Sequence, residues 1–455
     1  MSTLSSLLAM AAILAITQDS ACSQGIPYRL TPPWRIEIGP GIARIGEKEV
    51  QIQSPKAFDA TPPEMISIQD EKQEALPLFR PQAGGWMKGL RLNRLKTEEC
   101  TATGLLNPGS LRVKSEAGQS GVVYERGKDY EVDDFWGTVG RLEAGAIREG
   151  QGVFVDYQCT PCRLDTIVLT SGGEARYLQG EPGVGLVYPA REGEGEVPVV
   201  RLWFEGKMAG LTDDSIFPVT LTLEEAVSQL RRESQGQAEK NLPRTLSKLR
   251  KGEPVTVVAW GDSVTAGGGV ENDPSQRYQE VFAHDLRERF PKSAITLVTA
   301  AWGGRGSRDY LEAPSGGEKD FVRDVLEPNP DLVIIEFVND AYLDEERTQT
   351  HYARILSIFR EHGIEVILLT PHLVRPDWMD VKGMKFEEDP RPYVKGLRKF
   401  ARENGVALAD ASRIWCQLWQ MGIPYITLET NSINHPDERG HRIFSDALMA
   451  LFPES

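Results

Sequence analysis

Short, almost wholly apolar runs recur from Pro254 to the end of the chain, and segments with helical spacing separate them. Such runs are typical of strands buried on both faces of a parallel sheet. The runs are Val255–Trp260, Ala294–Ala300, Asp331–Phe337, Glu365–Thr370 and Val406–Ala409. Their alternation with helices predicts a three-layer α/β/α fold with helices on both faces of one parallel sheet. In folds of this kind, ligands bind at the carboxyl ends of the strands.

The region before this one has a different pattern. Over residues 25–217, short alternating runs such as Trp34–Ile38 and Asp165–Thr170 are separated by Gly, Pro and Asp clusters. This pattern predicts an all-β accessory domain, sandwich-like, with two packed antiparallel sheets. Residues 218–253 carry apolar residues at helical spacing with a break near Pro243, and they predict a helical linker to the α/β domain over residues 254–455.

The N-terminus predicts export. Leu7–Ile16 is an apolar run too short to span a bilayer, and the small residues around Cys22 suit a signal peptidase. We therefore expect residues 1–23 to be a signal peptide and the protein to be periplasmic or extracellular. Lipoprotein anchoring through Cys22 is an alternative, and an N-terminal helix of a cytoplasmic protein is another. No later stretch predicts a transmembrane helix.

Charge and cysteine content exclude some classes of protein. The 455-residue chain has a formal net charge of -15, which argues against a general nucleic-acid binder. Its five cysteines are too few for a disulfide-built scaffold. Cys159 and Cys162 lie between two predicted strands, in an expected hairpin turn, as a structural disulfide or as free thiols. We find no ligand set for a metal, and the sequence does not indicate an oligomeric state.

Two polar segments follow the first two predicted strands of the sheet. Gly261-Asp262-Ser263-Val264 comes directly after Val255–Trp260, so a serine hydroxyl there can face a ligand site. Taken alone, the position of this serine indicates a helix N-cap. Trp302–Ser307 is glycine-rich and lets backbone N–H groups approach a ligand. A dinucleotide-binding loop does not fit, because Asp309 stands where the third glycine would be.

Two further polar segments complete the pattern. Asn339 and Asp340 follow the third strand, where an amide can donate a hydrogen bond to a substrate or can cap the next helix. His435 lies just before the last predicted helix, where it can act as a general base for a serine or be a solvated loop residue. His441, on that helix, is expected to pack or to lie at the surface.

Together these segments resemble the SGNH (GDSL-like) serine hydrolases. The sequence GDSV resembles the first block of that family, FVND the third and INHPDERGH the fifth. The sequence TAAWGGRGSRDY is similar to the second block, especially as found in rhamnogalacturonan acetylesterase-like members. The resemblance covers residues 254–452 and implies a flavodoxin-like parallel sheet. It also implies Ser263 as nucleophile, His435 as base, and an oxyanion hole formed by Ser263, Gly304 and Asn339, with no metal or organic cofactor.

The sequence departs from the family pattern at two positions. Phe337 stands where the third block usually has glycine, which is expected to reshape the pocket wall. Ser432 stands three residues before His435, where the family has an aspartate that orients the imidazole. The remaining candidates for an orienting group are Glu429, Asn431, Ser432, a backbone carbonyl or the more distant Asp410. We expect the second ring nitrogen of His435 to face residues 429–432.

These features lead to a function hypothesis with two alternatives. The main hypothesis is an exported carboxylic-ester hydrolase that removes acetyl or other short acyl groups from a carbohydrate. The carbohydrate part rests on the family resemblance and on the attached β domain. One alternative is a glycan-binding protein whose catalytic activity is impaired, which only the missing aspartate supports. The other is an acyltransferase on the same scaffold.

Overall fold

A computed structural model describes residues 26–45 and 48–453. They form two compact units. The α/β unit comprises residues 221–419 and 434–453, and the β unit comprises residues 26–220 and 420–433. The expected signal peptide over residues 1–23, including Cys22, lies outside the described residues.

A five-stranded parallel sheet is the centre of the α/β unit. Its strands are β16 (Val255–Gly261), β17 (Ile295–Ala301), β18 (Leu332–Glu336), β19 (Glu365–Leu369) and β20 (Ala407–Ala409). They lie in the order β17–β16–β18–β19–β20, and every neighbouring pair is parallel. The chain runs from β16 outward to β17 and then crosses back to β18, so the order reverses at β16. Doubly wound sheets bind ligands at this point, and the predicted fold class is confirmed.

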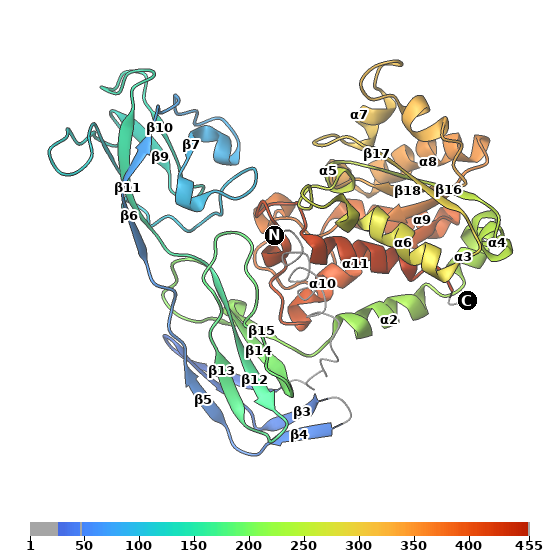
Figure 1. Cartoon of the computed structure of the whole chain (residues 1–455), viewed down its shortest axis with the longest axis horizontal. Coiled ribbons are helices and arrows are strands. Elements are labelled where there is room, and N and C mark those ends of the chain that lie inside the picture. Colours follow the sequence, from blue (N-terminus) through green and yellow to red (C-terminus); the bar gives the residue numbers. More distant parts are fainter. Residues whose placement is uncertain (1–25, 46–47, 454–455) are drawn as a thin grey trace, which may run out of the picture. The chain divides into compact units, whose positions relative to one another are not determined.

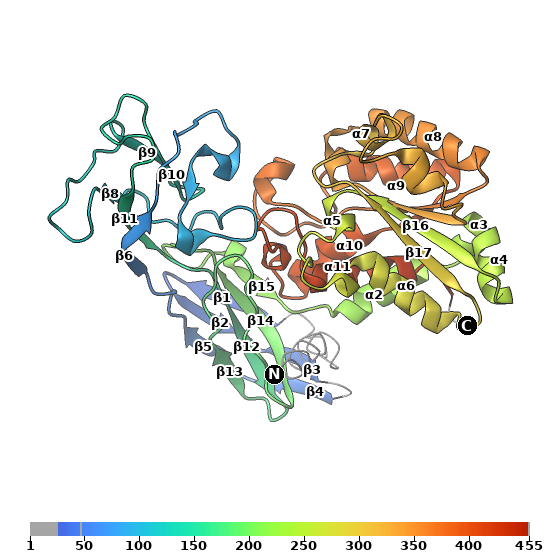
Figure 2. The same cartoon turned by 45° about the horizontal axis from the view of Figure 1, so that its top comes forward.

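Helices cover both faces of this sheet, as Figure 2 shows. They are α2 (Leu223–Glu233), α3 (Gln237–Asn241), α4 (Pro243–Lys251), α5 (Ser263–Ala266), α6 (Tyr278–Arg289), α7 (Ser307–Leu311), α8 (Glu345–Glu361), α9 (Pro392–Asn404), α10 (Ala411–Gln417) and α11 (Glu438–Met449). The apolar side chains of α8 and α9 share one core with Val258 and Trp260 of β16. On the opposite face α6 packs against α11, where the rings of Tyr278 and Phe444 lie 5.6 Å apart.

The helical segment expected as a linker is part of the α/β unit. At the start of α4, the backbone N–H groups of Arg244 and Thr245 donate hydrogen bonds to the side chain of Glu365 in β19. Leu246 of the same helix is buried. An amphipathic helix stabilises a protein by burying its apolar face. The segment expected as a linker therefore belongs to the α/β unit, and its helix α4 packs against the sheet.

The β unit is all-β as predicted, with antiparallel pairing. Its strands are β1 (Tyr28–Thr31), β2 (Arg35–Ile38), β3 (Gly41–Ile45), β4 (Lys48–Ile52), β5 (Lys56–Asp59), β6 (Ile66–Gln73), β7 (Leu90–Arg91), β8 (Arg112–Lys114), β9 (Tyr130–Asp133), β10 (Thr138–Arg141), β11 (Val153–Cys159), β12 (Arg163–Thr170), β13 (Ala175–Leu178), β14 (Glu196–Phe204) and β15 (Ile216–Pro218) (Figure 1). They form small sheets in the orders β1–β2–β5, β3–β4, β6–β11–β8, β7–β10–β9 and β13–β12–β14–β15. One core joins β2 to β12 and β14 through Ile36, Ile38, Ile167 and Leu202, which gives this part its sandwich-like character.

The cysteine pair does not lie in a hairpin turn. β11 ends at Cys159 and pairs with β6 and β8, whereas β12 begins at Arg163 and pairs with β13 and β14. The chain between them therefore passes from one sheet to another. Both Cys159 and Cys162 are buried free thiols. Burial raises the pKa of the Cys162 thiol to about 12, which keeps it uncharged and unreactive.

One segment from the C-terminal half of the chain, residues 420–433, folds with the β unit. At the start of this segment, the carbonyl of Gln420 accepts a hydrogen bond from the N–H of Thr220 at 2.7 Å. Tyr425 and Ile433 are each 1% exposed within it. The domain expected as one stretch over residues 254–455 is thus interrupted by a segment that belongs to the other unit.

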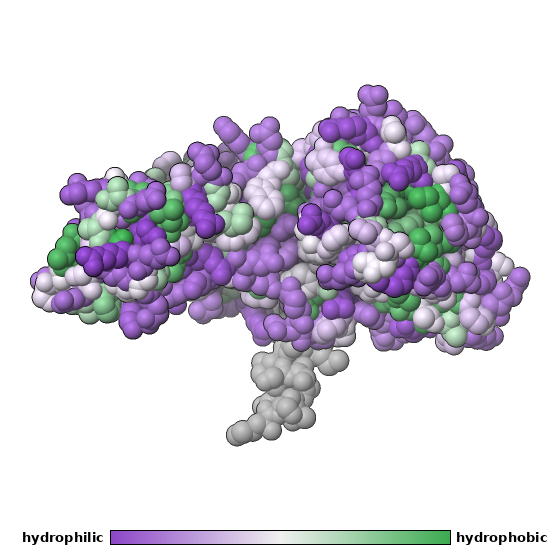
Figure 3. All heavy atoms as spheres, turned by 90° about the horizontal axis from the view of Figure 1, so that it is seen from above, coloured by the Kyte–Doolittle hydropathy of each residue, from purple (hydrophilic) through white to green (hydrophobic). Residues whose placement is uncertain are grey.

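The visible surface is mostly polar, with smaller hydrophobic areas, as Figure 3 shows. Exposed large hydrophobic residues include Met87 and Val123 of the β unit, and Tyr342 and Trp378 of the α/β unit. Scattered exposed apolar side chains are normal on globular proteins. Among the helices that the structure describes, none has the length and apolar character needed to cross a membrane.

Trp260 gives a test of the sheet's core. It is fully buried, and its ring lies 5.1 Å from Phe321 and 5.0 Å from Phe337. Trp260→Ala should lower the free energy of unfolding by about 3–5 kcal/mol, because it leaves a large cavity. Trp378→Ala, at a site that is 52% exposed, should change it by less than about 0.5 kcal/mol. Urea unfolding followed by circular dichroism measures both, and equal losses would contradict this account.

Candidate active site

Ser263 lies at the carboxyl end of the central strand. β16 ends at Gly261, and Ser263 is the first residue of the short helix α5. Asp262 caps this helix by accepting a hydrogen bond from the N–H of Val264 at 3.1 Å. The turn requires glycine, because a Cβ on Gly261 would lie 2.0 Å from the hydroxyl of Thr265. The tight turn places the Ser263 hydroxyl at the edge of the sheet where the sequence predicts a ligand site.

His435 lies beside Ser263, although 172 positions separate them in sequence. Its Nε2 atom is 3.1 Å from the Ser263 Oγ atom, within hydrogen-bonding distance. The expectation that these two residues meet across the carboxyl edge of the sheet is therefore confirmed. The His435 side chain is buried, and Gly268 packs against its ring so closely that a Cβ there would lie 3.0 Å from the ring.

Two backbone N–H groups near Ser263 are placed to receive a negatively charged oxygen. A Cβ on Gly303 would lie 3.6 Å from the Ser263 Cβ, so the glycine-rich loop passes directly beside the serine. Gly304 has a φ of 70°, in the left-handed region that favours glycine. Within the described part of the chain, the N–H groups of Ser263 and Gly304 donate to no protein acceptor. Free donors of this kind are what an oxyanion hole needs.

Asn339 is tied to the serine turn through Asp262. Both its backbone N–H and its side-chain Nδ2 donate to the same carboxylate oxygen of Asp262, at 2.9 Å and 3.0 Å. The amide group is thereby fixed in one orientation, and its second N–H remains for another acceptor. Asp262 lies within the GDSV segment, whose pattern did not by itself indicate this role. The signal was present, because an acid between a strand end and a serine can cap two elements.

Asp340 ties the third segment to the second. Its carboxylate accepts hydrogen bonds from the N–H and the hydroxyl of Ser307, at 2.9 Å and 2.6 Å, and from the hydroxyl of Tyr352 at 3.0 Å. Gly306 approaches so closely that a Cβ there would lie 2.5 Å from the carboxylate. Asp262 and Asp340 thus hold three loop segments, which come from three different strands, in one arrangement.

Burial raises the pKa of three carboxyl groups beneath the site. It raises the pKa of Asp262 to about 7, with hydrogen bonds from Asn339 acting in the opposite direction. It raises the pKa of Asp340 to about 6 and that of Glu336 well above its ordinary value. Glu336 is fully buried and accepts a hydrogen bond from Thr265. A carboxylate without water around it is costly, so these groups hold their protons to higher pH.

Phe337, which replaces the family's usual glycine, does not lie in the pocket wall. Its side chain is fully buried, and its ring meets that of Trp260 edge-on at 5.0 Å. The expectation that it reshapes the pocket wall is wrong, because the side chain points into the core that α8 and α9 cover.

Two further histidines support the loop that carries His435. The buried His372, just after β19, has its Nε2 atom 2.9 Å from the carbonyl of Asn434. His441 accepts from the N–H of Tyr278 and has its Nε2 atom 3.1 Å from the carbonyl of Gly268. Burial lowers the pKa of His441 to about 4, so it is neutral. As expected, His441 has a packing role.

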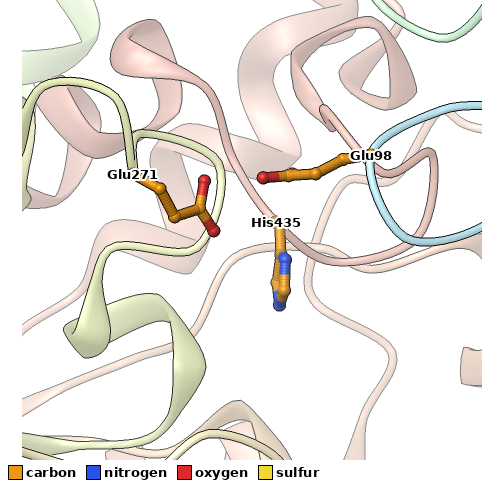
Figure 4. A group of neighbouring side chains, drawn as sticks. All are labelled: Glu98, Glu271 and His435. Carbon is orange, nitrogen blue, oxygen red and sulfur yellow. The ribbon is translucent and has the colours of Figure 1, made fainter.

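A carboxylate that the sequence analysis missed lies near His435. A side-chain oxygen of Glu271 and a ring nitrogen of His435 are within 4.8 Å of each other. Figure 4 shows the carboxyl group of Glu271 turned toward the ring. Glu271 also accepts a hydrogen bond from the N–H of Gly269 at 3.1 Å. Two unit charges at about this distance attract by roughly 1 kcal/mol in water and roughly 4 kcal/mol at an effective dielectric constant near 20.

Two of the residues proposed to orient His435, Asn431 and Asp410, bond to other groups. The nearby candidates are Glu429, Asn431 and Ser432, which fold with the β unit. The side chain of Asn431 accepts from the N–H of Ile433 at 2.9 Å. Asp410 pairs with Arg398 at 2.9 Å. That the second ring nitrogen of His435 faces residues 429–432 stays a prediction.

One surface group in the α/β unit has metal-ligand chemistry. His284, Asp285 and Glu288 lie close together on α6. Glu288 pairs with His284 at 3.4 Å, and Asp285 pairs with Arg442 at 3.1 Å. These ion pairs account for the cluster, so we assign no metal to it.

One comparison with known proteins matches the part of the chain that carries this site. Residues 259–443 match the model of the GDSL-like lipase/acylhydrolase family. These residues form a GDSL-like domain. The family resemblance of the four polar segments is confirmed. The predicted class of enzyme, a carboxylic-ester hydrolase, is confirmed as well. The GDSL-like domain includes all the site residues of the α/β unit described above. A search of curated proteins found no match.

Solved structures show a weaker likeness. A two-domain esterase active on acetylated mannans is 18% identical, with a TM-score of 0.37, over 47% of this chain and 52% of that one. The match thus spans about half the length of that esterase. An acetylxylan esterase from Geobacillus stearothermophilus is 18% identical, with a TM-score of 0.35, over 44% of this chain and 95% of that one. An α/β hydrolase from the Lake Arreo metagenome is 22% identical, with a TM-score of 0.35, over 43% and 94%.

The raised pKa of Asp262 predicts how stability depends on pH. A carboxyl group whose pKa is higher in the folded state stabilises the fold at low pH, and this contribution is lost as pH rises toward the folded value, here about 7. Between pH 5 and pH 7, the free energy of unfolding should fall by up to about 1.4 kcal/mol per pH unit for this group. Asp262→Asn should reduce that slope, and Asp59→Asn, an exposed carboxylate paired with Arg35, should not. Equal slopes for wild type and Asp262→Asn, measured by urea unfolding, would contradict the prediction.

Proposed function

We propose that this protein is a serine ester hydrolase whose active site is the Ser263–His435 pair. The observation that carries the proposal is the 3.1 Å distance between Oγ and Nε2 at the carboxyl edge of the sheet, inside the GDSL-like domain. A hydroxyl in contact with an imidazole is the arrangement that nucleophilic catalysis requires.

In the proposed mechanism, the Ser263 oxygen attacks the ester carbonyl while His435 accepts its proton. The negative charge on the carbonyl oxygen is held by the N–H groups of Ser263 and Gly304 and by the side chain of Asn339. His435 then gives the proton to the leaving alcohol. Water releases the acyl group from the serine by the same steps, with His435 as base again.

Glu271 takes part of the role of the missing aspartate in this proposal. The imidazole of His435 becomes positively charged once it has accepted the serine proton. A carboxylate within 4.8 Å stabilises that charge, although Glu271 is exposed and water screens the attraction. This contribution is smaller than that of a buried carboxylate bonded directly to the ring.

The proposed substrate is an acetylated or otherwise short-acylated carbohydrate. Support comes from residues 299–310, whose sequence is similar to the second block of rhamnogalacturonan acetylesterase-like enzymes. Acetate release from acetylated xylan, mannan and pectin, compared with hydrolysis of p-nitrophenyl esters of increasing chain length, tests this substrate class. A preference for long acyl chains would argue against it.

Ser263→Ala should abolish hydrolysis of p-nitrophenyl acetate and leave the fold intact. The hydroxyl forms the bond to the acyl group, and its loss removes little packing, so activity should fall by at least about a thousandfold. Thermal unfolding of both proteins is the control. A Ser263→Ala turnover within tenfold of wild type would contradict the proposal. A wild-type protein without esterase activity would favour the glycan-binding alternative.

Glu271→Gln should lower kcat by roughly threefold to tenfold with little change in KM, because it removes charge without changing shape. Since Glu271 is exposed, the difference from wild type should shrink as salt is raised. Glu280→Gln on α6 has the same chemical change in the same unit and should leave kcat unchanged. A Glu271→Gln enzyme with wild-type kcat at low salt would exclude this role.

We also propose that the protein is exported, on the basis of the apolar run Leu7–Ile16 and the small residues around Cys22. Mass spectrometry of the mature protein after expression in its full length tests this. Cleavage before or after Cys22, with or without a lipid on that cysteine, separates anchored from secreted forms. An uncleaved cytoplasmic protein would contradict export.

A further inference from the structure

The residues just before His435 are held by the β unit. The backbone carbonyl of Asn431 accepts hydrogen bonds from the Thr97 hydroxyl, at 3.3 Å, and from the Cys100 thiol. The Thr97 hydroxyl and the Cys100 sulfur are also in contact, at 3.2 Å. The hydroxyl of Thr430 donates to Glu98 at 2.7 Å. All these groups lie within one unit, so the contacts are internal to it.

Apolar packing holds the same residues. Ile433 is 1% exposed and forms a small core with Cys100 and Trp136, against which Trp86 packs. A large buried side chain of this kind fixes the backbone that carries it, because the site around it is close-packed.

The backbone here also has an unusual conformation. Ser432 has a φ of 58°, which residues other than glycine seldom adopt. Its N–H donates to the carbonyl of Glu429 at 3.0 Å, and the next N–H, of Ile433, donates to the Asn431 side chain. Such a conformation costs free energy and persists only where surrounding contacts impose it. The preceding carbonyl, of Asn431, is the group held by Thr97 and Cys100.

The chain leaves the β unit immediately afterwards. Ile433 is its last residue in that unit and Asn434 is the first in the α/β unit. The carbonyl of Asn434 is held by His372, and the next residue is His435, whose Nε2 atom meets the serine. Only one residue therefore separates the part held by the β unit from the proposed catalytic base.

We propose that Thr97 and Cys100 are positioning residues for catalysis, because they fix the backbone that leads into His435; this rests on the proposed function of the Ser263–His435 pair. The carbonyl of Asn431 is the point at which they act. Covalent continuity from residue 431 to residue 435 transmits the constraint on the backbone. A misplacement of about 1 Å can lower a rate by about a hundredfold.

The N-terminal residues then have a role beyond substrate binding. An accessory domain that only bound substrate would affect KM and could be removed. The β unit instead contains residues 420–433, and Ile433 among them loses its partners Cys100 and Trp136 if residues 26–220 are absent. The family match over residues 259–443 spans this segment without the residues that hold it.

The test compares substitutions that remove the donors with one that keeps them. Thr97→Val and Cys100→Ala, combined in the full-length chain, remove both hydrogen bonds to the Asn431 carbonyl. With p-nitrophenyl acetate, kcat should fall by at least about tenfold, while KM changes by less than about threefold. Cys100→Ser, which restores a donor of similar size, should recover most of the rate relative to Cys100→Ala.

Cys159→Ala is the matched control. Cys159 is also a buried free thiol of the β unit, 2% exposed, but it lies in β11 and bonds to none of residues 420–433 within the described chain. It should keep wild-type kcat even if its melting temperature falls as much as that of Cys100→Ala. The rate of Ser263 inactivation by diisopropyl fluorophosphate should fall in the double variant and not in the control.

Three outcomes would overturn the inference. The first is a folded double variant with kcat within twofold of wild type. The second is an equal loss of kcat in Cys159→Ala. The third is a tenfold rise of KM with kcat unchanged. If the double variant does not fold, Thr97→Val alone is compared with wild type by the same criterion. Ser263→Ala run in parallel separates the hypotheses: if it is inactive while the Thr97 and Cys100 variants are fully active, only the positioning role fails.

Discussion

The central strand β16 is hydrogen-bonded to β17 on one side and to β18 on the other, and the site depends on this pairing. Because the three strands are parallel, their carboxyl ends reach the same edge. The segment after each strand then contributes one polar group: Ser263, the Gly304 N–H and Asn339. Without a strand on each side of β16, the groups that follow β17 and β18 would have no common edge with the serine.

Buried carboxyl groups fix the geometry of that edge at a cost in stability. Asp262 joins the serine turn to Asn339, and Asp340 joins Asn339's segment to the glycine-rich loop. Both have pKa values raised by burial, so their ionised forms are unfavourable in the fold. Preorganised donors of this kind do not need to reorganise when charge develops, which is the advantage that offsets the cost.

The histidine is held differently from the other groups. It follows no strand, and the chain before it belongs to the β unit. His372 and Gly268 support it from within the α/β unit, whereas the contacts of Asn431 and Ile433 come from the β unit. Ser432, at the family's usual aspartate position, and Asn431, which Thr97 and Cys100 hold, both lie in the few residues just before His435.

The sequence by itself determined the parallel strands of the sheet and the four polar segments. A strand buried on both faces is an unbroken apolar run, and glycine or a polar residue marks the end of that run. It also indicated the pairing of Ser263 with His435 through the family pattern. It did not indicate that residues 420–433 leave the α/β unit, that Cys159 and Cys162 connect two sheets, that Phe337 points into the core or that Glu271 approaches His435. Each of these depends on contacts between residues far apart in the chain. The local spacing of residues does not predict which distant surface a segment will pack against. Only the tertiary structure decided them.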